Sequence, residues 1–199
     1  MCCYRLLGRI EIRPVLSVSE HEYLLAFAES RRWRRPDGPY AVPGNPAAEC
    51  LSVRPEAGQW ATPAAGQPGL YCPWRPADDG GALVPHTDED GVTPVSADEA
   101  AAWLCYLLDH FLGPDPVAAD DSHFSLVEVP DDGHRFDGAA VLGDDAGRLS
   151  AIRAHGRRVS LERLTSRPDP TWSQDRAPGR PGETSVPARD RSGRSRSVR

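Results

Sequence analysis

The run Arg31–Arg35 combines charge and aromaticity in a pattern that can bind a partner. Four arginines flank one tryptophan, Trp33. In a nucleic-acid site the indole would stack on a base while the guanidinium groups bind phosphates. The run also suits a charged helix end with Trp33 turned into the core, because cations stabilise the negative end of the helix dipole. We favour this second interpretation. The candidate contact residues are Arg31, Arg32, Trp33, Arg34 and Arg35.

The aromatic segment Gln67–Trp74 is a second candidate contact surface. It places Tyr71 and Trp74 three residues apart, with Cys72 between them. Cys72 would act as a nucleophile if a histidine elsewhere in the fold activated it. A buried cysteine in a strand is the more common situation. We therefore expect Tyr71 and Trp74 to contact a partner, and we assign no catalytic role to Cys72.

Two histidines and two aspartates form the best acid–base constellation in the chain. His123 and His134 flank a predicted strand, and Asp131 and Asp132 lie just before His134. Acid–base partners must lie within hydrogen-bond reach, directly or through one water. Ordinary loop histidines are the favoured alternative, so the sequence predicts no catalytic residue.

Acidic pairs recur without forming a metal-binding pattern. Carboxylates suit Ca²⁺ or Mg²⁺, but each pair falls at a predicted turn, where aspartate is favoured by hydrogen bonds to the backbone. The histidines and cysteines lack zinc spacing, and phosphate-binding and nucleophile-elbow motifs are missing. We expect no metal and no cofactor. The pairs are Asp78-Asp79, Asp120-Asp121, Asp131-Asp132 and Asp144-Asp145.

Charge is distributed unevenly along the chain. The net charge is −6, and every basic residue is arginine. Residues 165–199 carry eight arginines and four acidic residues, or +4, which leaves −10 on residues 1–164. An acidic body argues against wide nucleic-acid binding, because that mode relies on basic contacts to phosphate. The basic tail could still contact an acidic partner.

The cysteines and the hydropathy pattern indicate a reduced, cytoplasmic setting. The five cysteines are an odd number and include no Cys-x-x-Cys pair. The N-terminus lacks an apolar stretch of signal-peptide length. No stretch approaches the roughly 18 apolar residues of a membrane span. We therefore expect a cytoplasmic protein that does not enter a membrane.

Two capped helices anchor the predicted fold. Ser17-x-x-Glu20 and Ser96-x-x-Glu99 both have capping-box spacing. The first helix follows an alternating strand over residues 4–13 and is expected to continue into Arg31–Arg35. The second carries apolar residues at three- and four-residue steps and ends at Gly113, which suits a left-handed cap.

Short apolar runs predict the other strands. Residues 70–74 and 82–84 form two of them, and residues 124–129, 136–142, 149–154 and 159–164 resemble an antiparallel meander. Residues 36–70 are rich in proline and glycine and predict a long irregular connection. The fold class is α+β, with two helices packed on one face of a mostly antiparallel sheet. We expect residues 1–164 to form this single domain, and residues 165–199 a disordered tail.

Four blocks of sequence are familiar in combination: GRIEIRP from Gly8, LLAFAESRRWRR from Leu24, QPGLYCPW from Gln67 and WLCYLLDHFLGP from Trp103. Together they resemble a family of small uncharacterised proteins of bacteria and their phages or mobile elements. The similarity covers most of residues 4–163. Members usually continue with Asn-Gly-Glu and a Trp-containing segment, whereas the chain reads FDGAAVLGD from Phe136. The resemblance implies fold boundaries and a mobile-element origin, and it carries no activity.

Three functions follow as hypotheses. The leading one is a non-enzymatic accessory or protein-interaction module with an unknown protein partner. The second is a nucleic-acid-associated protein that uses Arg31–Arg35 and the basic tail. The third is an enzyme of unknown class built on His123, His134 and the neighbouring aspartates.

Overall fold

The computed structural model describes residues 4–44, 58, 61–88, 91–93 and 95–165. These residues fall within one compact unit, Met1–Arg167. They form two helices and a six-stranded antiparallel sheet in the order β2-β3-β1-β4-β5-β6, so the predicted α+β class is confirmed. Apart from Thr165, the predicted tail lies outside the described residues. The strands are β1 (Tyr4–Arg13), β2 (Trp74–Pro76), β3 (Ala82–Pro85), β4 (Arg135–Asp144), β5 (Leu149–Gly156) and β6 (Arg158–Arg163).

Alternating side chains give the sheet one buried and one solvated face. Leu6, Ile10 and Ile12 of β1 are almost fully buried, and Leu7 between them is 71% exposed. The same period continues on β4, where Phe136 is buried and Val141 partly exposed. Period-two alternation is the pattern of a sheet covered on one side. The predicted first strand is therefore confirmed, and β4, β5 and β6 form the expected meander.

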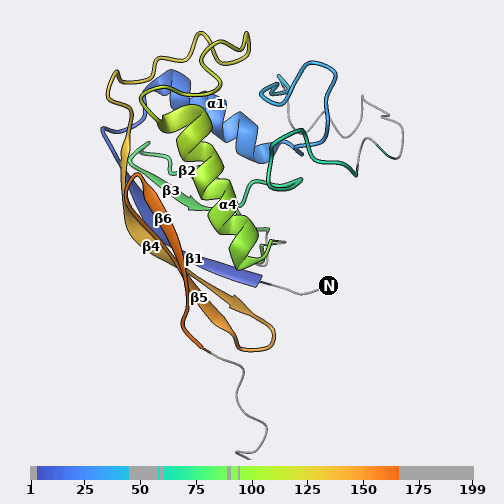
Figure 1. Ribbon diagram of the computed structural model, residues 1–199, viewed down its shortest axis with the longest axis vertical. Helices are drawn as coiled ribbons and strands as arrows, with labels where there is room; N and C mark the ends of the chain where they lie inside the picture. The colour runs from blue at the N-terminus through green and yellow to red at the C-terminus, as the bar shows by residue number, and fades with distance from the viewer. Residues whose placement is uncertain (1–3, 45–57, 59–60, 89–90, 94, 166–199) are drawn as a thin grey trace, which may run out of the picture. The chain divides into compact units, whose positions relative to one another are not determined.

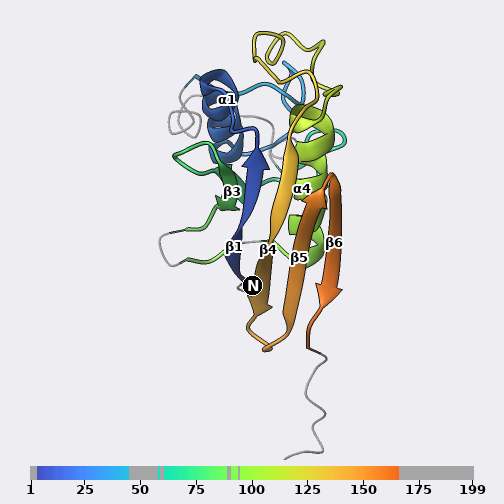
Figure 2. The same ribbon diagram turned by 90° about the vertical axis from the view of Figure 1, so that its left-hand side faces the viewer.

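Both helices cover the same face of the sheet (Figure 1), and Figure 2 views the sheet from its uncovered side. α1 (Val18–Glu29) begins with the complete capping box of Ser17 and Glu20. α4 (Ala97–Leu107) begins with half of one, because the Ser96 hydroxyl accepts from the Glu99 amide but no return bond forms. A π-helical turn, Leu108–Leu112, extends α4.

An aromatic cluster fills the space between the helices and the sheet. Phe27 of α1 packs edge-on against Trp103 and Phe111, and Phe111 also packs against Phe124. These rings are at most 2% exposed. Phe27, Trp103 and Phe111 of this cluster lie within the two helices that the sequence predicted.

Four sequence predictions fail in their local detail. α1 ends at Glu29 with Ser30 in extended conformation, so the basic run is not part of the helix. The strand predicted over 70–74 is displaced to β2 at 74–76. Residues 124–129 form turns and loop, because the amides of Phe124, Ser125 and Val127 bond to carbonyls only three or four residues away. Gly113 is extended, with φ −78°, so it does not form the predicted left-handed cap, and a Cβ on it would lie 3.1 Å from the Leu108 carbonyl oxygen.

A buried hydrogen bond between Glu20 and His134 joins the start of α1 to the start of β4. His134 Nε2 lies 2.6 Å from Glu20 Oε1, and both side chains are at most 1% exposed. His134 Nδ1 lies 2.8 Å from the Pro14 carbonyl oxygen, to which it must donate. The second Glu20 oxygen accepts from the Ser17 amide at 2.7 Å. One carboxylate thus caps the helix and fixes the segment that enters β4.

We expect E20Q to lower the free energy of unfolding by about 2 kcal/mol, because it replaces the carboxyl partner of a fully buried hydrogen bond to His134. Glutamine keeps the size of the side chain and can still cap the helix. Urea unfolding followed by circular dichroism measures the change. E22Q, at an exposed position of the same helix, should change stability by less than about 0.5 kcal/mol. Equal stability of the two variants would show that the pair does not brace the fold.

Candidate functional site

The two predicted contact segments lie beside each other. After Ser30 the chain is extended, and its backbone pairs with residues 62–70 instead of continuing the helix. The Arg32 amide donates to the Leu70 carbonyl at 2.8 Å, and the Arg34 amide to the Thr62 carbonyl at 3.0 Å. In return, the Ala64 amide donates to the Arg32 carbonyl at 3.0 Å. Segments about 30 to 40 positions apart in sequence thus form one structural unit.

Arg31 and Tyr71 meet on the surface of this unit. The Arg31 guanidinium donates to the Tyr71 hydroxyl, and its carbon lies 5.1 Å from the centre of the Tyr71 ring. Tyr71 is 44% exposed. Arg34 is exposed nearby in sequence, beyond the buried Trp33. We name Arg31, Arg34 and Tyr71 the arginine–tyrosine surface.

Three predicted contact residues lie in the interior instead. Arg32, Trp33 and Trp74 are 1%, 3% and 1% exposed, so a partner on the surface cannot reach them. Trp33 forms a β-bridge with Pro63. Trp74 donates from its indole nitrogen to the Ala100 carbonyl of α4 at 2.8 Å. For these residues the prediction of direct contact is corrected, because the extended backbone turns them into the core.

Arg35 occupies an intermediate position. Its guanidinium carbon lies 5.3 Å from the centre of the Trp33 ring, and it donates to the Arg31 carbonyl at 3.2 Å. Its side chain is half-buried. Arg35 therefore supports the backbone of the basic run and contributes only part of its side chain to the surface.

The buried Arg32 guanidinium holds the loop after the basic run. It donates to the carbonyls of Pro39 and Ala41, at 2.6 and 3.1 Å, and to the Ser30 hydroxyl at 2.8 Å. Its carbon lies 3.8 Å from the centre of the Phe27 ring. Burial lowers the pKa of Arg32 to about 10, so the group remains charged at neutral pH. Carbonyl oxygens and an aromatic face, rather than a carboxylate, stabilise this charge among the described residues.

A polar layer lies below the arginine–tyrosine surface. Gln67 donates to the Pro39 carbonyl at 2.6 Å, the same oxygen that Arg32 uses. Tyr106 stacks on His110 with ring centres 3.9 Å apart, and the Tyr40 hydroxyl lies 2.6 Å from His110 Nδ1. Burial lowers the pKa of His110. Sequence reasoning missed this layer, because Tyr40 lies in the proline-rich connection and has no periodic signal.

The loop Gln67–Trp74 packs tightly on the start of α4. A Cβ on Gly69 would lie 2.0 Å from Glu99 Oε1, so a larger residue there would displace the Glu99 carboxyl group. Partial burial raises the pKa of Glu99. Cys72 is buried and donates to the Trp74 carbonyl, and desolvation raises its thiol pKa to about 12. A thiol held in this form is a poor nucleophile, so the buried alternative for Cys72 is the correct one.

The acid–base constellation does not assemble. Both ring nitrogens of His134 are occupied by Glu20 and Pro14 in the interior. His123 is exposed on a turn, where its amide donates to the Asp121 carboxylate. Asp131 and Asp132 are exposed as well. The enzyme hypothesis loses the residues on which it was built.

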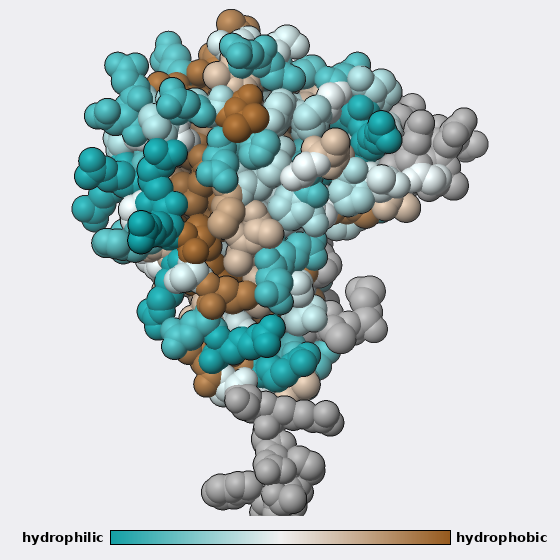
Figure 3. Space-filling model, in the orientation of Figure 1, coloured by the Kyte–Doolittle hydropathy of each residue, from teal (hydrophilic) through white to brown (hydrophobic). Residues whose placement is uncertain are grey.

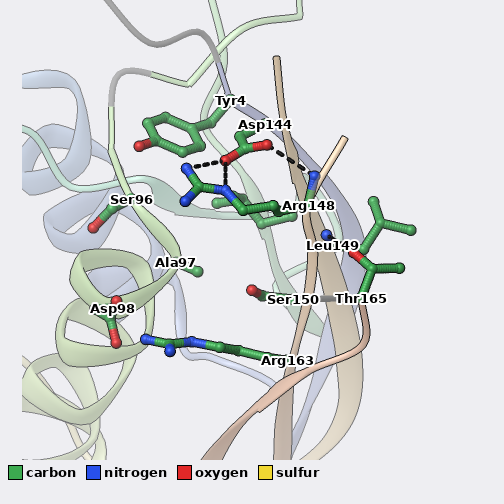
Figure 4. A pocket seen from close by; sticks show the side chains of 11 residues that line it. Tyr4, Ser96, Ala97, Asp98, Asp144, Arg148, Leu149, Ser150, Arg163 and Thr165 are labelled. Atoms are coloured by element: carbon green, nitrogen blue, oxygen red, sulfur yellow. Dashed lines mark hydrogen bonds and ion pairs between the residues drawn. The ribbon is translucent and has the colours of Figure 1, made fainter. Parts of the chain in front are cut away.

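A cavity of about 380 Å³ lies between the start of α4 and one end of the sheet (Figure 4). Asp144 accepts from Arg148 there, and the Arg163 side chain points toward Asp98. The cavity thus contains acidic and basic side chains, and each arginine lies next to an aspartate: Arg148 next to Asp144, and Arg163 next to Asp98. Within the described ranges, no three His, Cys, Asp or Glu side chains are placed to bind a metal ion.

Comparison with known proteins identifies no match for this chain. No protein-family model, no curated protein and no solved structure matches the chain. The resemblance to bacterial and phage proteins therefore stays a prediction. In the part of the chain that the structure covers, no helix is long and apolar enough to cross a membrane.

We expect R32M to lower the free energy of unfolding by about 3 kcal/mol, because the Ala41 carbonyl and the Ser30 hydroxyl lose their donor and the Pro39 carbonyl keeps only Gln67. R34M is the matched control, since Arg34 is exposed on the same segment, and it should cost less than about 0.5 kcal/mol. Urea unfolding monitored by tryptophan fluorescence gives both values. An R32M variant as stable as R34M would show that the guanidinium does not hold the loop.

Proposed function

We propose that the protein is a non-enzymatic protein-interaction module that binds a partner protein through the arginine–tyrosine surface. One observation carries this proposal: Arg31 and Tyr71, from separate segments, meet on the surface with a cation–π contact and a hydrogen bond. The mobile-element origin and the cytoplasmic location belong to the same proposal, and they rest on sequence alone.

The chemistry of the surface favours a partner segment that presents carboxylates. Arginine binds carboxylates in a planar, bidentate geometry. Tyrosine offers an apolar ring with a polar edge, and both residue types are enriched among those that dominate binding energy. The Tyr71 ring also restricts the Arg31 side chain before binding, which reduces the entropy lost on association.

Two observations favour a protein partner over nucleic acid. Residues 1–164 carry a formal charge of −10, which opposes the approach of a polyanion. Trp33, the ring expected to stack on a base, is only 3% exposed. The basic tail, on which the nucleic-acid alternative also depends, lies outside the described residues beyond Thr165.

Affinity capture with the full chain tests the proposal. Tagged wild-type protein, an R31E/Y71A variant and an R135E control are incubated with extract of the native host, with and without added nuclease. Arg135 is exposed on β4 in the sheet. We expect one protein to be captured equally by wild type and R135E. The R31E/Y71A variant should capture at least about tenfold less of it, because an arginine or tyrosine at the centre of an interface contributes about 2 kcal/mol.

The nuclease arm separates the two classes of partner. A protein partner survives nuclease treatment, whereas capture that disappears with nuclease would favour the nucleic-acid alternative. Capture that R31E/Y71A and R135E affect equally would contradict the proposed surface. Circular dichroism of each variant confirms that the fold is intact.

A further inference from the structure

The two edges of the sheet differ in their ability to accept another strand. β2, at one edge, has three residues, ends at Pro76 and follows Pro73. Prolines and short length protect an edge from pairing. β6, at the other edge, has six residues without proline, and among the described residues only β5 pairs with it. The edge at β6 is therefore the one open to strand addition.

The hydrogen-bond pattern shows which residues of β6 face outward. The Leu164 amide donates to the Leu149 carbonyl at 2.8 Å, in register with the β5–β6 ladder. Hydrogen-bonded and non-bonded pairs alternate along an antiparallel ladder. The backbone groups of residues 158, 160 and 162 therefore point toward β5. Those of Val159, Leu161 and Arg163 point away from the sheet.

The sequence of β6 is complementary to itself about Ser160. In an antiparallel pairing of two copies centred on this residue, Val159 lies opposite Leu161 of the second copy, and their outward amides and carbonyls bond to each other. Arg158 then lies opposite Glu162 on the other face of the strand. Both pairs occur twice because of the symmetry. The opposed charges occupy non-hydrogen-bonded positions, where side chains are closest.

Neighbouring registers lose this complementarity. A register centred on Leu161 puts Arg158 opposite Leu164 and Glu162 opposite Ser160. A register centred on Val159 puts Glu162 opposite Gly156. A register centred between two residues, such as Val159 and Ser160, would place outward-facing backbone groups opposite inward-facing ones, which prevents hydrogen bonding. Of the registers centred on Val159, Ser160 and Leu161, only the one about Ser160 places Arg158 opposite Glu162, and the same register places Arg163 opposite Arg157 of the second copy.

The surface beside β6 extends the contact beyond one strand. Apolar side chains gather along the seam between β6 and α4 (Figure 3). Val159 and Leu161 of β6 are partly exposed there, and so is Ala101 of α4. Cys105, one helical turn further, is exposed. Small residues on this side of α4 allow a second helix to approach closely.

We propose that two copies of the chain form a dimer by pairing their β6 strands antiparallel about Ser160, which joins the two sheets into one continuous sheet. Each copy contributes the same strand, as in a twofold symmetric interface. This dimer is independent of the arginine–tyrosine surface, which involves other elements, so either proposal can fail alone.

Charge reversal with rescue tests the register. R158E and E162R each place like charges opposite one another, and R158E/E162R restores opposite charges. Sedimentation velocity of the full chain across a concentration series gives the dissociation constants. We expect each single change to weaken the dimer at least about tenfold, because two symmetric attractions become repulsions. The double variant should return to within about threefold of wild type.

The single changes shift the net charge in opposite directions, so a general charge effect cannot weaken both and spare the double variant. A wild-type chain that stays monomeric at 100 µM, a concentration roughly a hundred thousandfold above a nanomolar dissociation constant, would overturn the proposal. So would a dimer that both single changes leave intact, or a folded double variant that remains monomeric.

A cysteine cross-link provides a second readout that does not depend on charge. Ser160 is exposed and would face its own copy across the twofold axis, within the range of Cα separations that a disulfide spans. In a background with Cys2, Cys3, Cys50 and Cys105 changed to serine, which leaves only the buried Cys72, S160C should form a covalent dimer on mild oxidation. D137C, at an exposed position on β4, should not. Equal cross-linking of both variants would overturn the pairing.

Discussion

Arg32 places a charged guanidinium in the interior, and the geometry of the surface above it depends on how that charge is satisfied. Three of its N–H groups donate to Ser30, Pro39 and Ala41, so the loop after the basic run must turn back over α1. The Arg32 backbone is bonded on both sides by residues 64 and 70. Arg32 thus fixes the loop at residues 39–41 with its side chain and the segment at residues 64–70 with its main chain.

This constraint explains why neighbouring residues of one run have different roles. Arg31 is partly exposed and contacts Tyr71, whereas Arg32 and Trp33 beside it are both buried. Pairing of the Arg32 and Arg34 amides with the Leu70 and Thr62 carbonyls fixes the backbone that gives them these positions. On β6, alternation separates the charged positions 158 and 162 from the apolar positions 159 and 161. Both proposed interaction surfaces therefore follow from local backbone geometry.

Local patterns allowed the sequence to predict the framework. Alternation identified β1 and the meander, and capping spacing identified the start of both helices, because these signals act over a few residues. The end of α1 was predicted wrongly, since basic residues favour a helix end but cannot reveal competing pairing with residues 62–70. The burial of Arg32 and the Tyr40–His110 contact depend on residues distant in sequence, and no local signal encodes them. The meeting of Arg31 and Tyr71 was equally inaccessible, although each residue was identified separately.

The geometry of the arginine–tyrosine surface depends on the burial of Arg32. Side-chain NMR of the arginines measures this burial most directly. With ¹⁵N-labelled protein at neutral pH, the guanidinium of Arg32 should give resolved, slowly exchanging Nη–H signals. These should show nuclear Overhauser effects to the Phe27 ring, from which the guanidinium carbon lies 3.8 Å. Averaged signals that exchange with solvent as fast as those of the exposed Arg34 would contradict the account.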